Sequence, residues 1–244
     1  MDYTIERIAS GIPGLDSVTQ GGFEKNSAIL VSGSGGTGKT IFALQFLMAG
    51  IRQNETGVYI SFEETKEKFF RHMYSLGWDL GELERKGLIV FIKYNPEKIA
   101  DIVREGGRDI GEAIRKLNGK RVVIDSLSAY TALFEREAEQ RRMLVDLFSM
   151  ISSWDCTTVV TAEEDQSPFV YRSSVMGFMA DAIILLYNII KDNKTMIRAM
   201  QVAKMRGTNH LVGVFPFVIE QKGIDAYPDQ VIFLMKGGKY IGKK

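Results

Sequence analysis

The segment from Gly33 to Thr40 has the residue types and the spacing that bind a nucleotide phosphate. It reads Gly33-Ser34-Gly35-Gly36-Thr37-Gly38-Lys39-Thr40 and matches G-x-x-x-x-G-K-[ST] at every fixed position. Glycines let successive backbone N–H groups converge on phosphates, Lys39 neutralises the outer phosphates, and the Thr40 hydroxyl is a ligand for Mg²⁺. We predict that this loop binds ATP or ADP together with Mg²⁺.

The alternative for this loop is a glycine-rich turn that happens to precede Lys-Thr. An apolar strand is expected directly before the loop, from Ala28 to Ser32, and an amphipathic helix directly after it, from Thr40 to Arg52. A phosphate-binding loop joins a strand to a helix in this way. The flanking elements therefore favour phosphate binding over the plain turn.

Asp125 ends a short hydrophobic strand, Val122 to Ile124. A carboxylate in that position can lie beside the Thr40 hydroxyl and hold Mg²⁺ through water. The alternative is that Asp125 or Ser126 caps the next helix. We predict the metal-binding role because the phosphate-binding loop calls for such a carboxylate.

A second acidic pair, Glu63 and Glu64, follows the expected strand Val58 to Phe62. Open α/β sheets bind ligands at the carboxyl ends of their strands, so one carboxylate could orient an attacking water and also face the metal. Both could instead complement the dipole of the helix that begins at Thr65. The residues alone leave these two interpretations open.

The elements that must position these side chains alternate along the chain. Apolar runs typical of buried parallel strands are separated by segments of helical period, which indicates an α/β fold with a mostly parallel sheet. The expected strands are 28–32, 58–62, 88–92, 122–124 and 157–161, and the expected helices are 40–52, 65–76, 99–117 and 135–153. Three later runs, at 182–187, 196–205 and 212–219, lack intervening helices and predict an antiparallel C-terminal extension. We expect one domain over residues 1–244.

Composition excludes several functional classes. The chain has 244 residues and a net charge of +1, which is unlike a dedicated nucleic-acid coat protein. Its N-terminus has no apolar stretch and no run spans a bilayer, so we expect a cytoplasmic protein without membrane contact. One cysteine, Cys156, and two histidines offer too few ligands for a tetrahedral zinc site. We read Cys156 as a small buried hydrophobe.

A set of motifs in a fixed order resembles the RecA-like ATPases of the KaiC type, which include single-domain archaeal and bacterial proteins. The likeness runs over nearly the whole chain, and its fold implication is a RecA-like P-loop NTPase core. The matching segments are 11–16 with 21–22, 33–40, 61–65, 75–79, 123–126, 181–186 and 204–210.

This resemblance implies roles for particular residues. Glu63 would correspond to the catalytic base and Glu64 to its acidic neighbour. Lys204 and Arg206 would reach the γ-phosphate held by the next subunit of a hexameric homo-oligomer. The base and ribose side of that nucleotide would be lined by Ser75, Met205, Thr208 and His210.

From the residues alone, Lys204 and Arg206 alternate along a strand and point to one face together. A charged, solvated strand edge is the alternative for that pattern. The chain also departs from the clock ATPase, because the adjacent Ser-Thr pair that the clock protein phosphorylates is replaced by Gly177 and Phe178. Autokinase activity is therefore not expected at that position, although Ser173 and Ser174 lie close by.

Three functions remain open at this point. The first is a Mg²⁺-dependent ATPase whose turnover drives a regulatory or assembly switch. The second is a recombinase or helicase relative that stacks DNA bases on Phe169 and Tyr171 beside Arg172; the low positive charge of that segment disfavours nucleic acid. The third is a scaffold cemented by nucleotide and read by partner proteins.

Overall fold

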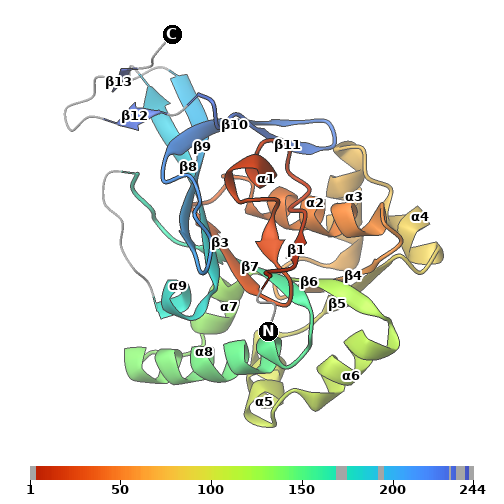
Figure 1. The fold of residues 1–244 in the computed structure, drawn as a ribbon. Helices are drawn as coiled ribbons and strands as arrows, with labels where there is room; N and C mark the ends of the chain where they lie inside the picture. The colour runs from red at the N-terminus through yellow and green to blue at the C-terminus, as the bar shows by residue number, and fades with distance from the viewer. Residues whose placement is uncertain (1–3, 169–174, 192–194, 231, 235–239, 242–244) are drawn as a thin grey trace.

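A nine-stranded sheet forms the centre of the molecule in the computed structural model, with helices on both faces (Figure 1). The structure describes residues 4–168, 175–191, 195–230, 232–234 and 240–241. Its strand order is β11-β10-β9-β8-β3-β7-β6-β4-β5. This arrangement is the predicted α/β class with a mostly parallel sheet, and it is confirmed.

Parallel pairing joins the six strands from β8 to β5 in that order. Because these strands run in one direction, their carboxyl ends lie along a single edge of the sheet, where ligands bind in open α/β folds. The strands are β3 (Ala28–Gly33), β4 (Thr56–Ser61), β5 (Ile89–Lys93), β6 (Gly119–Asp125), β7 (Thr157–Glu163) and β8 (Ala182–Lys191).

The remaining strands of the sheet form the predicted antiparallel extension. Beyond β8, the sheet continues through β9 (Thr195–Met205), β10 (Val214–Glu220) and β11 (Gly223–Ala226), each antiparallel to its neighbour. Among the described residues, two small strand pairs lie outside this sheet. They are β1 (Arg7–Ile8) with β2 (Phe23–Glu24), and β12 (Phe233–Leu234) with β13 (Tyr240–Ile241).

Alternate residues of the strands pack under helices in two separate hydrophobic clusters, one on each face of the sheet. Period-two alternation sends Ile29 and Tyr59 into one cluster and Leu30 and Val58 into the other. The first cluster is covered by α1 (Leu15–Val18), α2 (Lys39–Ile51), α3 (Lys66–Ser75) and α4 (Leu80–Arg85). The second is covered by α5 (Pro96–Arg104), α6 (Arg108–Lys116), α7 (Leu127–Thr131), α8 (Glu137–Ser152) and α9 (Val175–Met179).

One expected helix is wrong as predicted. The segment 99–117 forms two helices, α5 and α6, that are separated at Gly106 and Gly107. Both glycines have left-handed backbone angles, with φ of 83° and 62°, and that conformation ends a right-handed helix. An apolar period continues across the break because both helices bury residues against the same face of the sheet.

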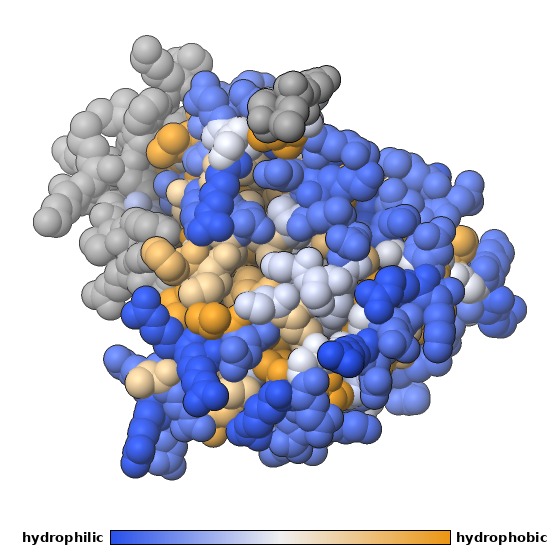
Figure 2. Space-filling model, turned by 60° about the horizontal axis from the view of Figure 1, so that its bottom comes forward, coloured by the Kyte–Doolittle hydropathy of each residue, from blue (hydrophilic) through white to orange (hydrophobic). Residues whose placement is uncertain are grey.

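The face that carries α5, α6 and α8, at the bottom of Figure 1, is mainly hydrophilic (Figure 2). Apolar side chains form a connected patch across the middle of this face, with hydrophilic side chains around it. Among the residues that the structure describes, no helix combines the length and the apolar character needed to cross a membrane.

Cys156 supports a first prediction about this core. Its thiol is buried and lies 3.1 Å from the Gly119 carbonyl oxygen, and burial raises its pKa to about 11. Because the thiolate is the reactive form, native protein at pH 8 should react very slowly with iodoacetamide, whereas protein in guanidinium should react at the rate of an ordinary thiol. Intact mass measured over time would show the difference. Rapid alkylation of native protein would contradict the buried structural role.

Candidate nucleotide-binding site

The loop from Gly33 to Thr40 joins β3 to α2, as its sequence predicts. Gly36 has φ of +74°, and an added Cβ would have no atom within 4 Å, so this part of the backbone faces open space. Gly38 has φ of +102°, and a Cβ there would lie 2.9 Å from the Ile219 side chain. Glycine at these two positions keeps an open, left-handed cradle of N–H groups that fits a phosphate.

Lys39 folds back over this loop. Its Nζ donates hydrogen bonds of 2.9 Å to the carbonyl oxygens of Gly33 and Ser34. Burial lowers the pKa of Lys39, while the carboxylates of Glu163, Asp125 and Glu63 act in the opposite direction. A cation held among backbone oxygens and carboxylates is the group that an incoming phosphate would contact.

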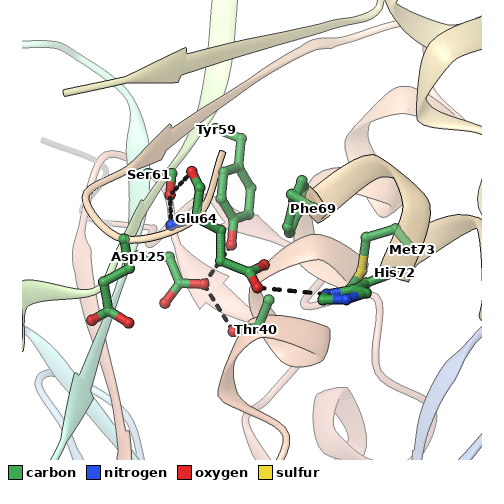
Figure 3. A pocket seen from close by; sticks show the side chains of 9 residues that line it. Thr40, Tyr59, Ser61, Glu64, Phe69, His72, Met73 and Asp125 are labelled. Carbon is green, nitrogen blue, oxygen red and sulfur yellow. Dashed lines mark hydrogen bonds and ion pairs between the residues drawn. The ribbon is translucent and has the colours of Figure 1, made fainter. Parts of the chain in front are cut away.

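The carboxylate of Asp125 accepts hydrogen bonds from three hydroxyl groups, and two of their residues, Thr40 and Tyr59, are drawn in Figure 3. Its Oδ2 accepts hydrogen bonds from Thr40 Oγ1 at 2.8 Å and from Tyr59 Oη at 2.5 Å, and its Oδ1 accepts from Thr161 Oγ1 at 2.5 Å. Burial and then the charge of Asp125 raise the pKa of Tyr59 well above its ordinary value, so the phenol stays a donor. The loop and the end of β6 are therefore joined directly.

Glu63 and Glu64 follow β4 and lie in the same pocket. The Ser126 hydroxyl donates a hydrogen bond to Glu63 Oε1, whereas Glu64 Oε1 lies 3.2 Å from Lys68 Nζ and 3.5 Å from His72 Nδ1. Glu64 is thus engaged by α3, and Glu63 is left on the side of Asp125. The pocket has a volume of about 320 Å³ and is lined by Thr40, Tyr59, Ser61, Glu63, Glu64, Phe69, His72, Met73 and Asp125.

The donor set of this pocket suits a hard cation. Hydroxyl and carboxylate oxygens of Thr40, Asp125 and Glu63 are the ligands that Mg²⁺ prefers. Within the described part of the chain, no three His, Cys, Asp or Glu side chains converge closely enough to hold a metal by themselves. A Mg²⁺ ion would therefore take further ligands from phosphate and water, as it does in nucleotide sites.

A second cavity of about 400 Å³ adjoins the loop and reveals a residue that sequence reasoning missed. It is lined by Gly36, Gly38, Lys39, Thr40, Ile41, Arg198 and Ile219. Arg198 lies on β9, and its Nε is buried with no hydrogen-bond partner among the described residues. An unpaired buried donor is costly, so it points to a polar ligand in this cavity. A cation within the apolar stretch from Met196 to Met200 was the available signal.

Lys204 and Arg206 do not reach their own phosphate-binding loop. Gly33, where the loop begins, pairs with Leu186 in the middle of β8, whereas Met205 pairs with Ala182 at the amino end of β8. The two cations therefore lie at the amino edge of the parallel strands and the loop lies at the carboxyl edge. Within one copy of the chain, these two cations and the phosphate-binding loop therefore lie apart.

Both cations contact the segment before β8. Lys204 Nζ donates to the carbonyl oxygens of Gly177, Phe178 and Ala180 at 2.6 to 3.2 Å. Arg206 forms a 3.1 Å ion pair with Asp181, whose other oxygen accepts from the Ala28 N–H. Burial lowers the pKa of Lys204, and the charge of Arg206 lowers it further.

The other residues predicted for the base side have separate surroundings. Ser75 is exposed at the end of α3 and donates to the His72 carbonyl. Met205 is buried in the core, so only its backbone is available to a ligand. Thr208 and His210 follow β9 near Arg206, and Thr208 accepts a hydrogen bond of 2.7 Å from Arg7. The described residues do not include Phe169, Tyr171, Arg172, Ser173 and Ser174.

Comparison with known proteins identifies the family. A family model described as "ATPase: KaiC" matches residues 8–231 of this chain. The chain belongs to the KaiC family of ATPases. The KaiC-type resemblance predicted from the motifs is therefore confirmed, and the family carries the RecA-like fold and ATP binding.

Relatives within the KaiC family differ in length. Circadian clock protein KaiC3 from Synechocystis is 35% identical over 239 residues, which cover 94% of this chain and 47% of that protein. This chain thus spans about half the length of the clock relatives. The UPF0273 protein PH0284 from Pyrococcus horikoshii is 32% identical, with 96% of this chain and 98% of that protein covered.

A solved KaiC-like structure has the same fold. The KaiC-like protein PH0186 from Pyrococcus horikoshii superposes with a TM-score of 0.80 and 33% sequence identity, covering 92% of this chain and all of that one. At this identity the likeness supports a shared fold and a shared family.

Proposed function

We propose that this chain is a single-domain, Mg²⁺-dependent ATPase that hydrolyses ATP to ADP and phosphate at the interfaces of a homo-oligomeric ring. The observation that carries the proposal is the 2.8 Å hydrogen bond between Thr40 and Asp125. It joins the phosphate-binding loop to the carboxylate at the end of β6. Its cofactor, Mg²⁺, would neutralise charge on the β- and γ-phosphates.

Binding is the task of the loop and of the cavity beside it. Backbone N–H groups between Gly35 and Thr40 would hold the phosphates, and Lys39 would exchange its carbonyl partners for phosphate oxygens. Thr40 and Asp125 would hold the metal, the latter through water. Arg198 would satisfy its unpaired Nε on the bound nucleotide.

Hydrolysis is assigned to Glu63. As the water attacks the γ-phosphorus and the bond to the β-phosphate oxygen breaks, Glu63 would take the proton of the water. The hydrogen bond from Ser126 fixes the Glu63 carboxylate. Glu64 would act as the acidic neighbour of Glu63. The Glu64 carboxylate already contacts Lys68 and His72 on α3.

A second copy of the chain would complete the site. Lys204 and Arg206 lie at the edge of the sheet opposite the loop. These cations would therefore contact the γ-phosphate of a nucleotide that a neighbouring subunit binds. A hexamer is the proposed ring, with nucleotide at each interface. Ser75, Met205, Thr208 and His210 would line the base and ribose side, and the turnover would serve as a regulatory switch.

One set of measurements tests this function. ATP hydrolysis and molecular mass in solution would be measured with and without ATP, Mg²⁺ and single-stranded DNA. We expect Mg²⁺-dependent turnover, a ring-sized mass with ATP, and no effect of DNA. Nucleotide-dependent assembly without turnover would instead indicate a scaffold, and salt-sensitive DNA binding would indicate a recombinase-like protein.

Replacing Arg198 with Met tests the cavity beside the loop. The change keeps the apolar stem and removes one charged hydrogen-bond donor, so the Kd of a fluorescent ATP analogue should rise about 10-fold. Arg115→Met on the exposed side of α6 is the matched control and should bind normally. An unchanged Kd in Arg198→Met would show that the nucleotide does not use this cavity.

A further inference from the structure

Tyr59 is a buried residue at the site to which the proposed reaction assigns no role. Its hydroxyl donates to Asp125 Oδ2 at 2.5 Å, which is the oxygen that also accepts from Thr40. A buried phenol needs some hydrogen-bond partner, so this contact could serve the core alone. However, the acceptor is Asp125, the carboxylate that we assign to the metal. A role of Tyr59 in metal binding can therefore be tested.

The ring of Tyr59 is held firmly in place. Only 1% of the residue is exposed, and its ring centroid lies 4.3 Å from that of Phe69 and 5.6 Å from that of Phe91, with the latter pair stacked at 9°. These contacts fix the direction of the hydroxyl toward Asp125 (Figure 3). Because the donor cannot swing away, the carboxylate cannot rotate without losing it.

The three donors also occupy most of the carboxylate. An ionised carboxylate has about four acceptor positions, and Thr40, Tyr59 and Thr161 fill three of them. One position is left for a further donor, such as a water on a hydrated metal. A carboxylate so occupied is unsuited to bidentate, direct coordination of the ion.

We propose that Tyr59 is a positioning residue that holds Asp125 for water-mediated contact with Mg²⁺. The inference rests on the proposed function, which assigns Asp125 to the metal. Groups that orient a metal-binding side chain commonly contribute 10- to 100-fold to metal affinity or activity. Tyr59→Phe removes the hydroxyl and keeps the stacked ring, so it isolates this contribution.

The test measures binding as well as turnover. Binding of a fluorescent ATP analogue would be followed while Mg²⁺ is titrated, and again with Mn²⁺, whose free concentration is read by electron paramagnetic resonance. In Tyr59→Phe we expect the metal concentration for half-maximal binding to rise about 10-fold. Binding of the analogue in EDTA should match that of the unaltered protein.

Tyr130→Phe is the matched control. Tyr130 is also buried and donates its hydroxyl to the Met143 carbonyl, but it lies in the hydrophobic cluster on the other face of the sheet. It should lose comparable thermal stability and keep the normal Mg²⁺ response. Thr161→Val removes another donor to Asp125 and should shift the Mg²⁺ response in the same direction, even if Tyr59→Phe fails to fold.

The outcomes separate this inference from the proposed function. A metal response that is normal in Tyr59→Phe, or in Thr161→Val where only that variant folds, would overturn the positioning role while leaving the Mg²⁺-dependent site intact. An unaltered protein whose nucleotide binding ignores Mg²⁺ would overturn both. A shifted metal response with unchanged metal-free binding supports the role of Tyr59.

Discussion

Replacing Arg206 with Ala should lower ATP turnover by a factor on the order of 10³ to 10⁵, while the Kd for ATP stays close to that of the unaltered protein. The physical reason is that, in the proposed site, a cation supplied from the neighbouring subunit would stabilise the charge that develops on the γ-phosphate during transfer. Binding depends instead on the subunit's own loop. Turnover is measured by phosphate release and binding by a fluorescent analogue.

Arg142→Ala, on an exposed part of α8, is the control for loss of one surface cation. It should hydrolyse ATP normally. Mass in solution must also be compared, because a loss of assembly would lower turnover for a different reason. Normal turnover in an assembled Arg206→Ala protein would show that this residue does not act on the γ-phosphate held by the neighbouring subunit.

Glu63→Gln should lower turnover about 10²- to 10⁴-fold, because an amide cannot take the proton of the attacking water. The change preserves shape and the ability to accept the hydrogen bond from Ser126. ATP should still bind, and assembly should persist. Glu67→Gln, in the first turn of α3, is a nearby control that should remain active.

Mixing the two inactive proteins gives a sharper result than either alone. An interface between one Arg206→Ala subunit and one Glu63→Gln subunit can contain an intact Glu63 and an intact Arg206. Partial recovery of turnover on mixing is therefore expected if each site is built from two subunits. If the mixture stays inactive although subunits exchange, the two residues do not act in a shared interfacial site.

The phosphate-binding loop, with the strand before it and the helix after it, could be predicted from the sequence because those signals are local. Gly33 to Thr40 carry the motif within eight positions, and the flanking strand and helix follow directly. Asp125 and Glu63 could be nominated because both end apolar strands. Parallel strands bring such ends to one edge, so their proximity follows from the fold class.

Other features depended on contacts that no local pattern encodes. Tyr59 reads as one more apolar strand residue, and its hydrogen bond to Asp125 exists only because β4 and β6 are neighbours in the sheet. Arg198 likewise becomes informative through its surroundings on β9. The separation of α5 and α6 was missed because the apolar period continues across Gly106 and Gly107.

The arrangement around Asp125 has a thermodynamic consequence. Thr40 follows β3, Thr161 lies on β7, Asp125 ends β6 and Tyr59 lies on β4, and these four strands are consecutive in the sheet. The site is therefore built from four neighbouring strands of the central sheet, and it forms only when all four are paired. A nucleotide bound there at 100 times its Kd stabilises the native state by about 2.7 kcal/mol through mass action. Nucleotide binding therefore raises the free energy of unfolding of the whole sheet, because the four strands must separate together for the site to be lost.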